Sequence, residues 1–245
     1  MLSVGYEKTE LLSLLGKEAL GESNAGLEPY SDFYTPIIFD SYGVNHAKYG
    51  LGRLGKHNSL VSKSELFTSE DIGLVQISAF KPNNLADVIN KYNQLGLADK
   101  LIGMLVLDSV IFNQDRHLGN LGLLVDNNNG SILGAAPMYD HNISMICYAT
   151  DNDILNINNF NEYCVRCNVG PKLYQGDFID FAKQLFNIVD QRTLSNIQRK
   201  LINIQGIKIR KHTKYNLTDY RIQRIEDLIH NQIRLMWESY FMNKI

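Results

Sequence analysis

Three polar residues stand at the ends of apolar segments in the middle of the sequence, and their types could bind a metal ion. Asp115 and Asn120 follow an apolar run that ends at Phe112, and Asp140 follows two short apolar segments separated by the sequence DNNNG. A hairpin turn at DNNNG would return the chain to its starting end, so that Asn120 and Asp140 meet over one spot. Carboxylate and amide oxygens suit Mg²⁺, which takes few protein ligands together with substrate phosphates. Asp115 would lie beside them, where it could orient an attacking hydroxyl group.

This layout is that of phosphoryl transfer in protein kinases. In that reaction one Asp accepts the proton of the substrate, an Asn five residues later binds metal, and an Asp after a β-hairpin binds the metal ions that bridge the phosphates. The order Asp115-Arg116-His117 inverts the His-Arg-Asp order of the kinase template. The alternative interpretation is that Asp115 and Asn120 are turn and cap residues and that Asp140 is an acidic loop residue.

The sequences NQDRHLGNLGLL and AAPMYDHNIS resemble those of the HipA-like and CtkA-like bacterial Ser/Thr kinases, and the DRHxxN motif is also shared with phosphatidylinositol 3- and 4-kinases. The resemblance covers residues 28 to 190. It implies that Asp115 is the catalytic base or orients the hydroxyl, and that Asn120 and Asp140 bind Mg²⁺. It also implies that His117 steadies the loop by a hydrogen bond and that Arg116 is structural.

For the nucleotide, the sequence LVSKSELFTSEDIGLVQI resembles the HipA-like strands that lead to the hinge between the lobes. The resemblance implies that the backbone of this hinge holds the adenine of ATP, through Glu65, Leu66, Phe67 and Thr68. The N-terminal part departs from the kinase pattern, because it has no Gly-rich loop before residue 20 and no recognisable strand Lys.

The nearest cation to the expected strand Lys is Lys17, which is the candidate for anchoring the ATP phosphates. A solvated surface Lys is the alternative interpretation of this residue. Its acidic partner would be Asp32 or Glu28, and the sequence does not choose between them.

The resemblance implies an ATP- and Mg²⁺-dependent protein Ser/Thr kinase. One version of this hypothesis is that the kinase is the toxin of a toxin–antitoxin pair. Its partners would be a protein with a Ser or Thr acceptor and an antitoxin or a protein that completes the N-lobe. The main alternative is a pseudokinase or a split-kinase subunit that works as a binding module. A lipid kinase is a weaker alternative, because the sequence has no evident membrane-binding basic or amphipathic surface.

The elements expected around these residues indicate an α+β protein. Hydrophobic periodicity and turn residues predict short strands at 47–54, 59–63 and 74–77, and a hairpin at 121–125 and 132–134. They predict helices at 30–42, 84–92, 97–112, 177–189, 194–204 and 218–241, the first with Ser31 as its N-cap. Leu11–Leu15 could be a strand or the start of a helix. This order of elements suggests a two-lobed α+β protein. The resemblance implies a protein-kinase-like fold, with a small strand-containing N-lobe and hinge at 1–78 and a mainly helical C-lobe at 79–245.

Composition limits the partners and the compartment. The formal net charge of −2 argues against nucleic acid or an anionic membrane as a direct partner. The three Cys residues are typical of a reducing compartment, and no apolar run is long enough to span a bilayer, so we expect a cytoplasmic protein. The pair Cys164 and Cys167 has no second pair to complete a zinc site. The basic segment Ile207–Lys214 is a solvated loop or a contact for an acidic partner.

Overall fold

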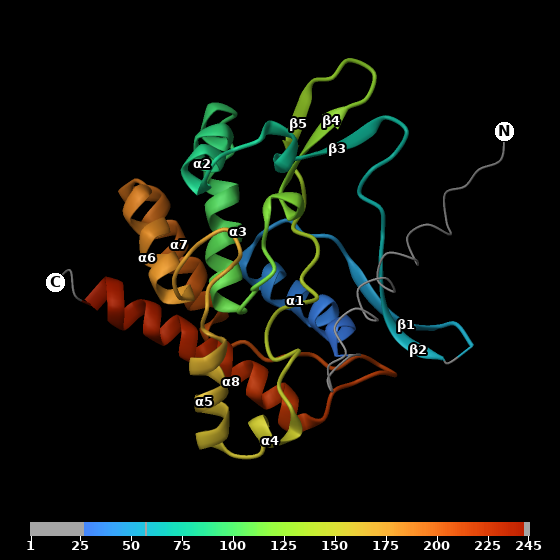
Figure 1. Cartoon of the computed structure of the whole chain (residues 1–245), viewed down its shortest axis with the longest axis vertical. Coiled ribbons are helices and arrows are strands. Elements are labelled where there is room, and N and C mark those ends of the chain that lie inside the picture. The colour runs from blue at the N-terminus through green and yellow to red at the C-terminus, as the bar shows by residue number, and fades with distance from the viewer. Residues whose placement is uncertain (1–26, 57, 243–245) are drawn as a thin grey trace.

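The computed structural model describes residues 27–56 and 58–242, so the predictions for Leu11–Leu15 and Lys17 lie outside the described residues. Helices gather on one side of the molecule around a central helix, α3, and two small β-sheets lie on the other side (Figure 1). None of the described helices combines the length and the apolar character that are needed to cross a membrane.

The first described element is helix α1 (Glu28–Tyr42), which packs against the antiparallel hairpin of β1 (Tyr49–Leu54) and β2 (Ser59–Ser64). The predicted N-cap Ser31 is wrong, since Leu27 occupies that position and Pro29 fills the first turn, where its missing N–H is not needed. Ser31 lies inside helix α1, near its start, and its buried hydroxyl donates a hydrogen bond to the carbonyl of Ser144 at 3.0 Å. Gly43 ends the helix in the left-handed conformation, with φ of 78°.

The second sheet joins a strand from before the central helix to the predicted hairpin. Strand β3 (Ile72–Gln76) pairs antiparallel with β4 (Gly122–Asp126), which pairs antiparallel with β5 (Ile132–Ala135). Gly122 lies at a close approach between β3 and β4, because a Cβ atom there would lie 2.5 Å from a methyl group of Leu74. The strands predicted for these segments are therefore confirmed, with boundaries shifted by one or two residues.

The remaining elements form the helical side. The central helix α3 (Ala98–Val110) is buried continuously from Leu101 to Val110, and it packs against α2 (Leu85–Gln94), α6 (Phe178–Ile188) and α8 (Asp219–Met236). Asn84, Asp177 and Thr218 cap the three partner helices by accepting a backbone N–H. The other elements on this side are α7 (Gln191–Gln205) and a π-helical turn, η3 (Trp237–Phe241). The short turns η1 (Ile77–Phe80) and η2 (Leu118–Asn120) contact each other and strand β3.

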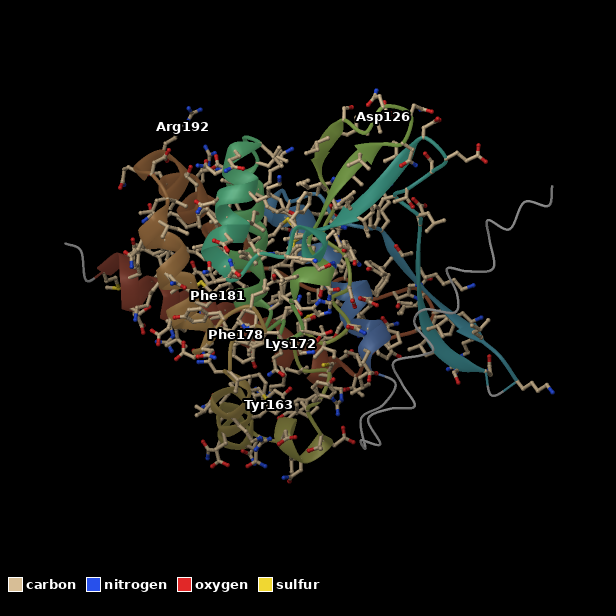
Figure 2. All side chains as sticks on the ribbon, turned by 45° about the horizontal axis from the view of Figure 1, so that its top comes forward. Asp126, Tyr163, Lys172, Phe178, Phe181 and Arg192 are labelled. Atoms are coloured by element: carbon tan, nitrogen blue, oxygen red, sulfur yellow. The ribbon has the colours of Figure 1, made fainter. Side chains whose placement is uncertain are left out.

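Two helices were not expected from the sequence. The short helix α4 (Asp151–Ile154) and helix α5 (Ile157–Cys167) follow the second sheet, and a loop of residues 168–177 then leads into α6. On α6, Phe178 and Phe181 are fully buried (Figure 2), and the ring of Phe178 stacks on that of Phe112 with centroids 5.0 Å apart. This packing fixes the start of α6, and with it the end of the 168–177 loop, against the end of α3.

The basic segment Ile207–Lys214 connects α7 and α8. Lys208 pairs with Glu226 at 2.6 Å, and Lys211 pairs with Asp219. Two of its cations are therefore partly neutralised by acids of the neighbouring helix, which favours the solvated-loop interpretation over a contact for an acidic partner.

Candidate active site

The loop that carries Asp115, His117 and Asn120 connects the buried helix α3 to strand β4. The chain leaves α3 through Phe112, which has a φ of 54°, and then forms the short helical turn η2 that ends at Asn120. His117 is the N-cap of η2, and its Nδ1 accepts the backbone N–H of Gly119 at 3.0 Å. The imidazole thus closes the turn from within the loop.

Arg116 is the structural centre of this loop. Its side chain is completely buried, and its guanidinium makes a bidentate pair with Asp108 of α3, at 2.8 and 3.1 Å. The same group donates to the carbonyl of Asn120 at 2.9 Å and to the carbonyl of Tyr139 at 3.0 Å. Arg116 therefore holds the backbone of one candidate metal ligand, and the residue before the other, to the central helix.

The Asp108–Arg116 pair carries its charges inside the core. Burial raises the pKa of Asp108, and the neighbouring guanidinium opposes that rise. The amide of Asn113 also donates to the Asp108 carboxylate, at 2.8 Å. A bidentate geometry with further hydrogen bonds is the arrangement in which a buried ion pair is tolerated.

Asp140 reaches the same place from the end of strand β5. The chain before it pairs with the segment ahead of β1, where Met138 exchanges backbone hydrogen bonds with Asn45 and Ala47 at 2.9 and 2.7 Å. The N–H of Asp140 donates to the hydroxyl of Tyr49 at 3.0 Å. Asp140 itself has a φ of 59°, a left-handed conformation that is uncommon for a residue with a side chain.

Asn120 and Asp140 come together as the sequence predicts. Asn120 is buried, and its amide lies 3.4 Å from the backbone carbonyl of Asp115. Burial raises the pKa of Asp140, and the negative charge of Asp115 raises it further, while Arg116, His117 and a hydrogen bond from Asn120 lower it only in part. Two carboxylates and the side-chain amide of Asn120 therefore share a site in which negative charge is incompletely balanced.

This donor set fits Mg²⁺. Among residues 27–56 and 58–242 no group of three or more His, Cys, Asp and Glu side chains is arranged to hold a metal ion. One carboxylate and one amide from the protein are what a hard cation needs when substrate phosphates and water complete its shell. Asn120 and Asp140 are the residues that would hold it, and the added charge would relieve the repulsion between Asp140 and Asp115.

Lys172 is a cation of this site that was not predicted from the sequence. The ammonium group of Lys172 contacts a carboxylate oxygen of Asp115, although the two residues are 57 positions apart. Lys172 belongs to the 168–177 loop and is labelled near the middle of the view in Figure 2. Its backbone N–H donates to the carbonyl of Gln114 at 3.1 Å.

The predicted adenine-binding segment connects β2 and β3. The N–H of Glu65 donates to the carbonyl of Lys48 at 3.3 Å, and the side chain of Leu66 is largely exposed. The ring of Phe67 lies 5.5 Å from the ring of Tyr139, the residue before Asp140. The structure therefore brings this segment, which ends at the half-buried Thr68, next to the candidate metal site.

One of the two acids considered as a partner for Lys17 lies at the same junction. The buried carboxylate of Asp32 accepts the hydroxyl of Ser62 at 2.7 Å and the N–H of His141 at 3.1 Å. Asp32 thus links α1 and β2 to the residue that follows Asp140, whereas Glu28 lies in the first turn of α1.

Comparison with known proteins shows the fold. No protein-family model matches the sequence, and no curated protein matches it at a significant level. Among solved structures, the Helicobacter pylori proinflammatory kinase CtkA matches with a TM-score of 0.64 and 17% identity, over 89% of this chain and 88% of that chain. HipA, in the Shewanella oneidensis HipA, HipB and operator DNA complex, matches with a TM-score of 0.47 and 10% identity, over 87% of this chain and 56% of that chain. The chain therefore has the α+β, protein-kinase-like fold of CtkA.

Proposed function

We propose that this protein is an ATP- and Mg²⁺-dependent kinase that phosphorylates Ser or Thr hydroxyls of a protein substrate. The observation that carries the proposal is the meeting of Asp115, Asn120 and Asp140 around one spot. The buried guanidinium of Arg116 holds the carbonyl of Asn120 and that of Tyr139, the residue before Asp140. These residue types, in this order along a kinase-like fold, are the ones that phosphoryl transfer requires. The fold likeness to CtkA supports the same activity class.

In the proposed reaction, Asp115 orients the acceptor hydroxyl and accepts its proton. The hydroxyl oxygen forms a bond to the γ-phosphorus of ATP, while the bond from that phosphorus to the β,γ-bridging oxygen breaks and its electron pair leaves with ADP. Asn120 and Asp140 would hold Mg²⁺, and the bound ion would supply positive charge that neutralises charge on the phosphate oxygens. Glu65, Leu66, Phe67 and Thr68 offer the backbone groups that would bind the adenine.

The residues of this site act mainly by position. Asn120 is fixed through its carbonyl by Arg116, and Asp140 is fixed through its N–H by Tyr49. Fixed groups avoid the loss of freedom that would otherwise slow the reaction, and they act without reorganising as charge develops. The acid–base role of Asp115 is a smaller contribution, of about 10²- to 10⁴-fold in rate.

The test is the variant Asp115→Asn. Because this residue acts on the acceptor and not on the metal, we expect phosphoryl transfer to fall by about 100-fold or more while Mg·ATP binding changes by less than about threefold. Transfer is measured with γ-labelled ATP and dephosphorylated casein as a generic acceptor, followed by phosphoamino acid analysis, and binding is measured by calorimetry.

The matched control is Asp126→Asn, at the turn end of the β4–β5 hairpin (Figure 2), which should change neither quantity. Loss of Mg·ATP binding in Asp115→Asn would contradict the assigned role. Absence of Mg·ATP binding to the unaltered protein at millimolar nucleotide would overturn the kinase proposal in favour of a binding module.

A further inference from the structure

We propose that Lys172 contacts the transferred phosphoryl group and compensates its charge in the transition state. This inference rests on the proposed function and adds to it a residue from outside the two motifs. The observation behind it is the contact between the Lys172 ammonium and the Asp115 carboxylate.

The exposure of the two side chains indicates on which side of Asp115 the ammonium lies. The Asp115 side chain is 17% exposed and the Lys172 side chain is 65% exposed. A mostly covered carboxylate that meets a mostly exposed ammonium does so on its open side. An acceptor hydroxyl must reach the part of this carboxylate that stays exposed, and it would then lie close to the ammonium that contacts the same carboxylate.

The distances required by the reaction bring the phosphoryl group within reach of Lys172. The hydroxyl must lie about 3 Å from the base, and the reacting phosphorus about 3–3.5 Å from the hydroxyl oxygen. The reacting phosphorus would therefore lie within about 6.5 Å of Asp115, and the flexible four-carbon stem of a Lys side chain can cover part of that distance.

Arg116, another cation at the site, is not free to contact the phosphoryl group. The guanidinium of Arg116 has five N–H donors, and all five are directed at protein groups: two at Asp108, one at each of the carbonyls of Asn120 and Tyr139, and one at His141. Arg116 is also completely buried. Lys172 is thus the described cation that both touches Asp115 and has an exposed head group.

Hydrogen bonds fix the loop backbone that carries Lys172, which is not the case for most residues of surface ion pairs. Its N–H donates to the carbonyl of Gln114, and the amide of Gln114 donates to the carbonyl of Cys167 at 2.8 Å. The side chain of Asn168 accepts the N–H of Phe178 at 3.0 Å, which ties together the two ends of the 168–177 loop. A group that must act on a reacting atom needs such support, whereas an isolated surface pair contributes little and is easily rearranged.

The experiment compares Lys172→Gln, Lys172→Arg and a matched control, Lys183→Gln, which removes the Lys of an exposed Lys–Asp pair on α6. Binding of Mg·ADP is measured by calorimetry with and without fluoroaluminate, which mimics the transferring phosphoryl group. Steady-state transfer to casein gives kcat and the KM for ATP.

If Lys172 acts on the phosphoryl group, Lys172→Gln should bind Mg·ADP within about threefold of the unaltered protein but lose about 10- to 100-fold of the tightening that fluoroaluminate produces. The value of kcat should fall by a similar factor at nearly constant KM. Lys172→Arg should keep most of both quantities, because the positive charge is retained, and Lys183→Gln should keep all of them.

Two results would overturn the inference, and they differ. Full fluoroaluminate tightening in Lys172→Gln, with unchanged kcat, would show that the Lys172–Asp115 contact is only a surface ion pair and would leave the proposed kinase function standing. No Mg·ADP binding by the unaltered protein would remove the proposed function and this role together. Unfolding temperatures within about 2 °C of each other verify that the variants are folded.

Discussion

The buried pair of Asp108 and Arg116 gives the sharpest test of how this site is built. The variant Arg116→Met removes the guanidinium from a completely buried position and leaves the Asp108 carboxylate with the hydrogen bond from the Asn113 amide. Loss of one member of a buried ion pair costs about 3–5 kcal/mol, because the other charge is left uncompensated. For a domain of this size we expect the unfolding temperature to fall by roughly 6–20 °C.

The double variant Asp108→Leu/Arg116→Met separates stability from function. It leaves no charge at these two buried positions, so most of the lost stability should return. The carbonyls of Asn120 and Tyr139 would still lack their donor, however, and Asn120 and Asp140 would no longer be held together. We therefore expect Mg·ATP binding to stay weak in the double variant even though its stability recovers.

The assays are urea unfolding and calorimetry with Mg·ATP. The control is Arg234→Met, which breaks an exposed bidentate pair with Glu238 and should cost less than about 1 kcal/mol. A loss of under about 1 kcal/mol in Arg116→Met would refute the assignment of a buried ion pair. Recovery of Mg·ATP binding together with stability in the double variant would refute the positioning role of Arg116.

Two further variants test the metal ligand and the loop. Burial and the Asp115 charge raise the pKa of Asp140, so the folded protein holds the Asp140 proton to a higher pH than the unfolded chain does. Asp140→Asn should therefore stabilise the fold at neutral pH and lose this gain below a pH of about 3.8, as measured by urea unfolding against pH. The same variant should abolish Mg·ATP binding, as measured by calorimetry. A lower stability of Asp140→Asn at pH 7 would contradict the reasoning. Gly170 has a φ of 71°, and a Cβ there would lie 2.3 Å from the carbonyl oxygen of Gly176. Gly170→Ala should lower the free energy of unfolding by roughly 1–3 kcal/mol and slow phosphoryl transfer by displacing Lys172. The control Gly206→Ala should change little, because open space surrounds that position. Equal effects of the two variants would exclude backbone strain as the cause.

The parts of the fold that were predicted from the sequence are those with local signals. Helices α6 and α8 combine an acidic or hydroxyl cap with a continuous apolar face, and both features are visible in a short window. Helix α5 was missed because its sequence, INNFNEYCVRC, is rich in Asn, and the helix is stabilised by burying Phe160, Tyr163 and Cys164 against the rest of the chain. Ser31 misled the prediction because a good capping residue within the sequence does not cap when Pro29 starts the helix earlier.

The candidate site divides in the same way. Asp115 and Asn120 lie within six residues of each other, and a hairpin is enough to bring Asp140 to them. Lys172 could not be predicted, because nothing near it in the sequence indicates that the 168–177 loop returns to Gln114. The partner of Arg116 had a weak signal, namely one acid, Asp108, in the apolar run of α3.

The charged side chain of Asp140 destabilises the fold, and this argues that the site binds a cation and is not purely structural. Its charge is disfavoured by burial and by Asp115, and its backbone adopts a left-handed conformation. A scaffold that bound no cation would be more stable with a neutral residue here, since Asn also accepts this conformation. Arg116 nevertheless holds the carbonyls of Asn120 and Tyr139 in place with two hydrogen bonds. The fold thus keeps the Asp140 carboxylate near that of Asp115, and this pair of negative charges attracts a cation. Strain and unbalanced charge of this kind are typical of functional sites, and a divalent cation would relieve the charge imbalance.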